Sequence, residues 1–210
     1  MKASSLKWSL RVMSSELSRC PWSLSTQQYR DYHDEEWGRP CHDEQKLFEM
    51  LLLEGAQAGL SWRTILEKRE GYRAVFDGFD AQRMARYSDT ELEEKLKDAR
   101  IVRNRLKVFG FRRNALAYLK LCESEGSLDA WLWRQVGAKP VLNRWALHKE
   151  VPATTPLSDA ISKDLKKRGF TFVGSTIIYA YLQSMGVVND HLTSCAWHPG
   201  NLVIPAKAGI

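Results

Sequence analysis

Residues 165–183 read LKKRGFTFVGSTIIYAYLQ and join two helical segments through a short apolar turn. Gly169 and Gly174 bracket the turn, and glycine permits positive φ angles and close approach of another backbone. The amides at the start of the second helix can hold a phosphate. Three basic residues stand just before the turn: Lys166, Lys167 and Arg168. The pattern therefore indicates a contact with a phosphate backbone, and a plain helix–helix turn with a solvated basic face remains the alternative.

Helical periodicity continues on both sides of this turn. A further long helix is expected over residues 105–125, and Gly71 is expected to end the helix that begins near residue 62. Residues 137–156 contain three prolines and read as a connector, and no pair of alternating strands appears. The predicted class is all-α. The expected helices have serine or aspartate at their first turns: Asp43, Ser61, Ser88, Ser127 and Ser158.

Composition sets broad limits on partners and location. The chain has 210 residues, 44% of them hydrophobic and 27% charged, as in ordinary soluble globular proteins. No apolar run approaches the roughly 20 residues that a membrane span needs. The net charge of +6 permits a nucleic-acid partner without requiring one. Four cysteines are too few for a secreted disulfide scaffold, so we expect a reducing cytoplasm.

The two ends of the chain differ from its middle. Residues 1–18 are basic but lack a continuous apolar core, so they are expected to form a disordered arm, within which Met13 is an alternative start. Residues 202–210 have no helical period and are expected to be a flexible tail. A single folded unit is therefore predicted over residues 19–201.

Cysteine and histidine pairs lie near both ends of that unit. Cys20 and His33 are near the front, and His191 and Cys195 are four residues apart near the back. Two thiolates and two imidazoles can form a closed tetrahedral zinc site, which here would join the two ends. Ordinary buried thiols and hydrogen-bonded histidines are the alternative reading.

A second candidate site centres on Glu54, which follows an apolar run in MLLLEGAQAGLSW, residues 50–62. Burying a carboxylate is costly unless a positive or hydrogen-bonding group meets it. Aromatic faces attract cations, so an acid among aromatic rings could form a pocket for a flat, positively charged ring. The alternative is that the rings are core and that Glu54 caps a helix or pairs with an arginine. The aromatic candidates are Trp22, Tyr29, Tyr32, Trp37 and Trp62.

Several motifs together resemble one family, the 3-methyladenine DNA glycosylase I family of the helix-hairpin-helix DNA glycosylase superfamily. They are RCPW, YRDYHDEEWG, LFEMLLLEGAQAGLSW, LEKREGYRAVF, DARIVRNRLK, LKKRGFTFVGSTIIYAY and VNDH followed by Cys195. The resemblance implies a monomeric, cytoplasmic bacterial repair enzyme that flips 3-methyladenine out of alkylated double-stranded DNA and hydrolyses its N-glycosidic bond. It also implies an all-helical fold with one structural zinc ion per chain.

The family's functional residues match positions of this chain one by one. The implied zinc ligands are Cys20, His33, His191 and Cys195. The implied DNA-binding hairpin is residues 168–174, with Lys166 and Lys167 beside it. The implied catalytic residues are Glu54, Tyr29 and Tyr32, and the residues implied to hold the base are Trp62, Trp22 and Trp37.

One position departs from the superfamily pattern. Relatives usually carry a catalytic aspartate in a V-D-x-H motif, whereas this chain has Asn189 at that position. Asp190 is adjacent and is expected to point elsewhere. Two rival functions remain open, a non-catalytic zinc-stabilised DNA-binding protein and a glycosylase of broader range that also removes 7-methylguanine. A lyase is disfavoured because STIIYAYLQSM, residues 175–185, contains no lysine.

Overall fold

The structure is a computed structural model that describes residues 17–201. Almost all of the expected N-terminal arm, and the whole of the expected C-terminal tail, lie outside the described residues. The first half contains η1 (Pro21–Ser25), α1 (Gln27–Glu35), α2 (Glu44–Gln57), α3 (Trp62–Val75), η2 (Asp77–Phe79), α4 (Ala81–Met84) and α5 (Asp89–Lys95). The second half contains α6 (Arg105–Glu125), α7 (Leu128–Arg134), β1 (Val141–Leu142), η3 (His148–Glu150), α8 (Pro156–Lys167), α9 (Ser175–Ser184) and β2 (Val188–Asn189).

Side-chain caps set most helix starts, as the sequence predicts. Asp43, Ser61 and Ser127 each accept a hydrogen bond from a backbone amide in the first turn of α2, α3 and α7. Ser88 forms a reciprocal capping box with Glu91 at the start of α5. These bonds satisfy amides that a helix leaves without partners at its N-terminus.

Two predicted boundaries are wrong. The third helix does not end at Gly71 but continues to Val75. Gly71 has a packing role instead, because a Cβ atom there would lie 2.5 Å from the carbonyl oxygen of Arg100. Helix α8 begins at Pro156 rather than at Ser158, since Thr155 is the N-cap and proline is well suited to the first helical position.

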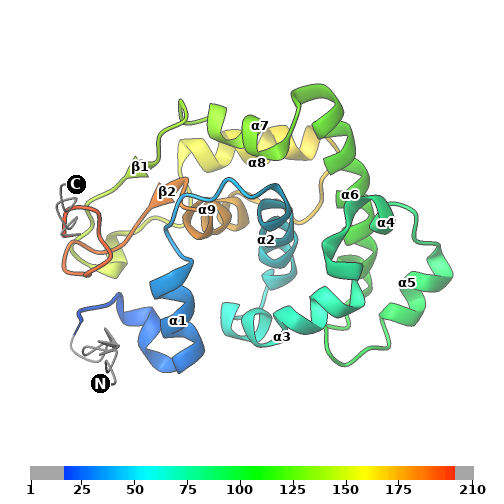
Figure 1. Cartoon of the computed structure of the whole chain (residues 1–210), viewed down its shortest axis with the longest axis horizontal. Helices are drawn as coiled ribbons and strands as arrows, with labels where there is room; N and C mark the ends of the chain where they lie inside the picture. The colour runs from blue at the N-terminus through cyan, green and yellow to red at the C-terminus, as the bar shows by residue number, and fades with distance from the viewer. Residues whose placement is uncertain (1–16, 202–210) are drawn as a thin grey trace, which may run out of the picture.

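Helix α2 lies at the centre of the fold (Figure 1) and packs against α3, α6, α7 and α9. Every residue from Leu47 to Ala56 is buried. The apolar run that the sequence shows is therefore a helical segment buried on all sides, and Glu49 and Glu54 are buried with it.

The turn over residues 168–174 joins α8 to α9 and packs onto α2 and α6. Cβ atoms built at Gly55 and at Gly110 would lie 3.1–3.2 Å from Phe172, so both helices offer a glycine where the turn docks. The Asn114 side chain donates to the carbonyl of Thr171 and accepts from its amide, which holds the turn in place. The hairpin therefore sits directly against the residue that follows Glu54.

A short parallel pair of strands, which sequence analysis does not anticipate, joins the connector to the C-terminal segment. Val141 pairs with Val188 and Leu142 with Asn189. Two residues per strand are too few to show an alternating pattern in the sequence. The two ends of the described chain, coloured blue and red, lie at the same end of the molecule (Figure 1). Within residues 17–201, no helix is long and apolar enough to cross a membrane.

Candidate active site

A cavity of about 320 Å³ lies between α1, α2 and α3 on one side and α9 and the segment after β2 on the other. All six residues that sequence analysis assigns to the base pocket line it, so the structure brings together segments that are up to forty positions apart. They are Trp22, Tyr29, Tyr32, Trp37, Glu54 and Trp62.

The aromatic rings form a connected wall. Trp22 lies edge-on to Tyr29 and Trp37, with ring centroids 5.7 and 5.1 Å apart. Tyr32 and Trp62 are tilted toward each other at 5.4 Å. The Nε1 atom of Trp62 is buried without a hydrogen-bond partner among the described residues. The wall therefore offers a ligand both aromatic ring faces and the N–H group of Trp62 as a hydrogen-bond donor.

Glu54 is 3% exposed and lies at the end of this wall. Desolvation by burial raises the pKa of its carboxyl group from 4.5 to about 8, and a hydrogen bond with Ser184 only partly opposes this rise. Among residues 17–201, no lysine, arginine or histidine forms an ion pair with it. Glu54 is therefore mostly protonated in the empty cavity at neutral pH.

Glu49, one and a half turns earlier on α2, shows what an acid in this helix does when its role is structural. Arg69 Nε lies 2.7 Å from Glu49 Oε1, and Arg73 Nη2 lies 2.8 Å from the same oxygen. Arg69 also bridges to Glu36. Arg69 and Arg73 thus pair with Glu49, and among residues 17–201 no arginine pairs with Glu54, so the alternative in which Glu54 pairs with an arginine is wrong.

Asp190 is itself one of the residues that line the cavity, which differs from the expectation that it points elsewhere. Asn189 faces away and donates from its amide to the carbonyl of Gly38. Sequence analysis likewise assigns no role to His148, which lines the cavity from η3. No local pattern marks these residues, since strand pairing and the connector bring them to the cavity. The remaining lining residues that sequence analysis missed are Gln57, Val151, Ala180, Gln183 and Leu192.

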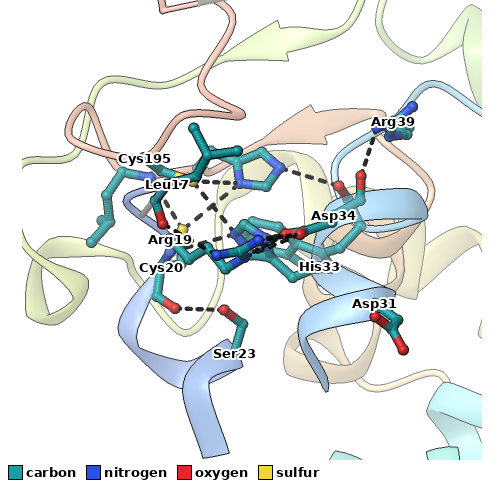
Figure 2. A network of polar contacts seen from close by, with 12 residues as sticks. Leu17, Arg19, Cys20, Ser23, Asp31, His33, Asp34, Arg39 and Cys195 are labelled. Carbon is teal, nitrogen blue, oxygen red and sulfur yellow. Dashed lines mark hydrogen bonds and ion pairs between the residues drawn. The ribbon is translucent and has the colours of Figure 1, made fainter. Parts of the chain in front are cut away.

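The four residues with metal-ligand side chains converge next to the cavity, and Figure 2 shows Cys20, His33 and Cys195 among them. The ligand atoms of Cys20, His33, His191 and Cys195 are buried and lie within 4.8 Å of one another. Cys195 Sγ is 3.5 Å from His33 Nε2 and from His191 Nδ1, and Cys20 Sγ is 3.7 Å from His191 Nδ1. A tetrahedral zinc ion with ordinary bond lengths separates its sulfur and nitrogen ligands by about 3.5 Å. The donor set and its spacing fit zinc.

Outer contacts orient both imidazoles toward this centre. His33 donates from Nδ1 to Asp34, which a bidentate Arg19 holds in turn (Figure 2). His191 donates from Nε2 to the carbonyl of Trp37 at 3.1 Å. Histidines that bind metal ordinarily donate their other ring N–H in this way. A hydrogen bond from the Cys20 thiol lowers the pKa of the Cys195 thiol.

The basic residues at the hairpin differ in their surroundings. Lys166 and Lys167 are exposed, as is Gly169. Arg168 is partly buried, pairs with Asp164 and Glu125 at 2.8 and 2.6 Å, and lies over the ring of Trp131. Gly174 is the N-cap of α9, where no side chain caps the helix, and a Cβ atom there would meet nothing within 4 Å. The lysines and the α9 amides are therefore open to a partner, whereas Arg168 braces the turn.

Comparison with known proteins agrees with this arrangement. Residues 22–198 match the methyladenine glycosylase family. The chain is 45% identical over 185 residues to DNA-3-methyladenine glycosylase 1 of Escherichia coli (strain K12), which covers 88% of this chain and 99% of that protein.

Solved structures agree as well. A crystal structure of 3-methyladenine DNA glycosylase I has a TM-score of 0.85 and 46% identity, covering 87% of this chain and all of that one. A structure addressing 3-methyladenine recognition by the Staphylococcus aureus 3-methyladenine DNA glycosylase I has a TM-score of 0.84 and 32% identity, covering 87% and 97% of the two chains. From its sequence and its fold, the chain belongs to the methyladenine glycosylase family.

Proposed function

We propose that this protein is a DNA-3-methyladenine glycosylase of base-excision repair, which hydrolyses the bond between 3-methyladenine and deoxyribose in alkylated DNA. The observation that carries the proposal is an aromatic-walled cavity with a buried acid, Glu54, that has no cationic partner among the described residues. The names of the relatives agree with this activity.

The chemistry follows from the lesion. Methylation at N3 places a positive charge on the adenine ring while its glycosidic bond is intact, so no acid is needed to protonate the leaving group. Extruding the nucleotide costs a few kcal/mol, and less where pairing is already damaged. The main task of the cavity is therefore to accept a cationic methylated ring and to refuse neutral adenine.

Glu54 suits this task because its ionisation depends on what occupies the cavity. With its pKa raised to about 8, the acid is mostly neutral when the cavity is empty. A cationic ring beside it favours the carboxylate and forms a charge-assisted hydrogen bond. Neutral adenine offers no such compensation, so it would leave Glu54 either protonated or buried as an unpaired anion.

The aromatic residues would hold the ring in place. Stacking of a base on an aromatic side chain is worth about 1–3 kcal/mol, and Trp62 has both a ring face and a free Nε1 donor at the cavity. Tyr29 and Tyr32 would direct their hydroxyl groups to ring nitrogens or to water. Trp22 and Trp37 pack behind them and keep the wall rigid.

The hairpin would bind DNA phosphates without reading sequence. The exposed Lys166 and Lys167 and the uncapped N-terminus of α9 at Gly174 support this role. Gly169 has a φ of +95°, which lets the backbone turn there, and it belongs to the proposed DNA surface. Arg168 acts by bracing the turn, since two carboxylates already hold its guanidinium. We further propose double-stranded DNA as the partner of a monomeric enzyme.

Cys20, His33, His191 and Cys195 would hold one zinc ion. All four positions are protein ligands, so the site is closed and its role is structural. Zinc there would link the segment before α1 to the segment after β2, which both contribute to the cavity. None of the four cysteines forms a disulfide, which agrees with a reducing cytoplasm, and that location is part of the proposal.

The test is release of free base from methylated duplex DNA under single-turnover conditions. We expect the wild-type protein to release 3-methyladenine, and separate detection of 7-methylguanine will show whether the range is broader. Glu54→Gln should slow release by about ten- to a hundredfold, because a charge-assisted bond is worth roughly 1.5–3 kcal/mol. Duplex binding should stay nearly unchanged. Wild-type protein that releases no methylated base would contradict the proposed function, and wild-type rates in the variant would contradict the role of Glu54.

A further inference from the structure

Asp190 is a second buried carboxylate in the cavity wall, and the proposed function has not used it. It is 2% exposed and follows β2 directly. Asn143 and Trp145 donate to its Oδ1 atom at 2.7 and 2.8 Å. Tyr179 and Gln183 donate to its Oδ2 atom. A carboxylate has about four lone-pair sites, so four donors occupy all of them.

All four groups around the Asp190 side chain donate hydrogen bonds, as the geometry of a carboxylate requires. A protonated carboxyl group would turn its own O–H toward a partner that also donates, whereas the carboxylate accepts every bond. The same bonds leave it no free lone pair for a base, a sugar or an attacking water. Asp190 can therefore influence a molecule in the cavity only through its charge.

The two acids occupy different parts of the lining. They share no hydrogen-bond partner: Glu54 bonds to Ser184, whereas Asp190 accepts from residues of the connector and of α9. Among the described residues that line the cavity there is no lysine or arginine, so no fixed side-chain cation there neutralises Asp190. Two thiolates balance the charge of the zinc ion proposed nearby.

The reaction moves a positive charge from one place to another. As the bond between C1′ and the ring nitrogen breaks, its electron pair stays with the base, which leaves as neutral 3-methyladenine. The positive charge then lies on the sugar. Water adds its oxygen to C1′ and releases a proton to solvent. A carboxylate that faces the base loses its partner during this step, so the new cation needs a different negative charge.

We propose that Asp190 provides the fixed negative charge that stabilises the sugar cation formed as the glycosidic bond breaks. The inference depends on the proposed function. A charge that its donors already hold in place needs no reorganisation when the cation forms, and such preorganised electrostatics are the most effective kind. Asn143, Trp145, Tyr179 and Gln183 are positioning residues that fix this carboxylate.

The test compares two abasic-site analogues in the same duplex, a cationic pyrrolidine ring and a neutral tetrahydrofuran ring. Wild-type protein should bind the cationic analogue at least about tenfold more tightly, as a charge pair in a cavity of moderate dielectric implies. Asp190→Asn should remove this preference. Tyr179→Phe is the matched control, because it deletes a hydrogen bond to the same carboxylate and keeps the charge, so the preference should survive.

The ratio of the two affinities is measured within one protein, so partial loss of folded material cancels. Equal binding of the two analogues by wild-type protein would overturn the proposal even if Asp190→Asn does not fold. A preference retained in Asp190→Asn would overturn it as well. Absence of base release by wild-type protein is a separate result that contradicts the proposed function instead.

Discussion

Two glutamates on one helix show how the surroundings of a single residue separate structure from function. Glu49 and Glu54 are both buried in α2. Glu49 meets Arg69 and Arg73, and its charge is compensated within the fold. Glu54 meets the Ser184 hydroxyl and aromatic rings, and burial raises its pKa to about 8. A buried acid whose pKa is raised by desolvation and that has no cationic partner is typical of a functional site.

Burial raises the pKa of Glu54, and this shift predicts that the free energy of unfolding depends on pH. Below pH 4.5 the acid is protonated in both the unfolded and the folded chain. Between pH 4.5 and about 8 the unfolded chain releases this proton while the folded chain keeps it, so stability falls as pH rises, and above pH 8 the effect is constant. The full effect is on the order of 5 kcal/mol, since each pKa unit corresponds to about 1.4 kcal/mol.

Glu54→Gln removes the titrating carboxyl group, so the variant should not lose this stability as the pH rises. Relative to wild-type protein, the variant should gain several kcal/mol in its free energy of unfolding when the pH rises from 5 to 9. Denaturant unfolding of both proteins at the two pH values measures the difference, and every other titrating group cancels. A difference that does not change with pH would show that the acid is not held in its protonated form.

At the scale of elements, the α8–α9 hairpin is positioned by small residues on its neighbours. Gly55 of α2 and Gly110 of α6 leave room for Phe172, whose φ of 56° belongs to the tight turn. Glu54 precedes Gly55, so the same contact that seats the hairpin places the acid beside the proposed DNA surface. If the hairpin binds DNA as proposed, we expect the packing of α2, α6 and the turn to couple that binding to base recognition.

The hairpin prediction uses the open N-cap of α9. Gly174→Asp should support the helix, because aspartate is a favoured N-cap, while its charge repels a phosphate. Duplex affinity should fall about tenfold at low salt, across unrelated sequences, and less at high salt. Gly174→Asn is the matched control, with nearly the same shape and no charge, and should bind DNA more tightly than the aspartate variant. Equal affinities of the two variants would argue against a phosphate at this position.

At the scale of the whole molecule, the two ends of the folded unit meet at the Cys/His cluster. Cys20 and Cys195 are 175 positions apart and both are fully buried. The segments that they anchor carry Trp22 on one side and Asp190 on the other, so the cluster joins two segments that line the cavity. A metal ion bound only by the folded chain stabilises the fold, and the free energy of metal binding sets the size of this stabilisation.

Metal analysis of purified protein should therefore give about one zinc per chain. Cys195→Ser should lose the metal and lower the melting temperature markedly, because binding energy at a structural zinc site is folding energy. Cys122→Ser is the control, since Cys122 lies outside the cluster and hydrogen bonds to Glu44. Zinc retained at full occupancy in Cys195→Ser would contradict the assignment.

Features that depend on neighbouring residues can be predicted from the sequence alone. The caps at Asp43, Ser61, Ser88 and Ser127 act within three residues, and helical periodicity needs only a dozen, so most helices agree with the prediction. The aromatic residues and Glu54 could be assigned to one pocket because the motifs that contain them resemble a known family. The helical class and the aromatic residues and Glu54 that line the cavity were therefore within reach of the sequence.

Features that depend on contacts between distant residues could not be predicted in this way. Gly71 resembles a helix terminus until Arg100 is seen packed against it, and Glu49 resembles Glu54 until α3 brings its arginines. Asp190 faces the cavity because β2 pairs with β1 and because four donors from the connector and α9 hold its carboxylate. Long-range packing sets these environments, and it is these environments that determine which buried acids carry charge and what that charge can stabilise.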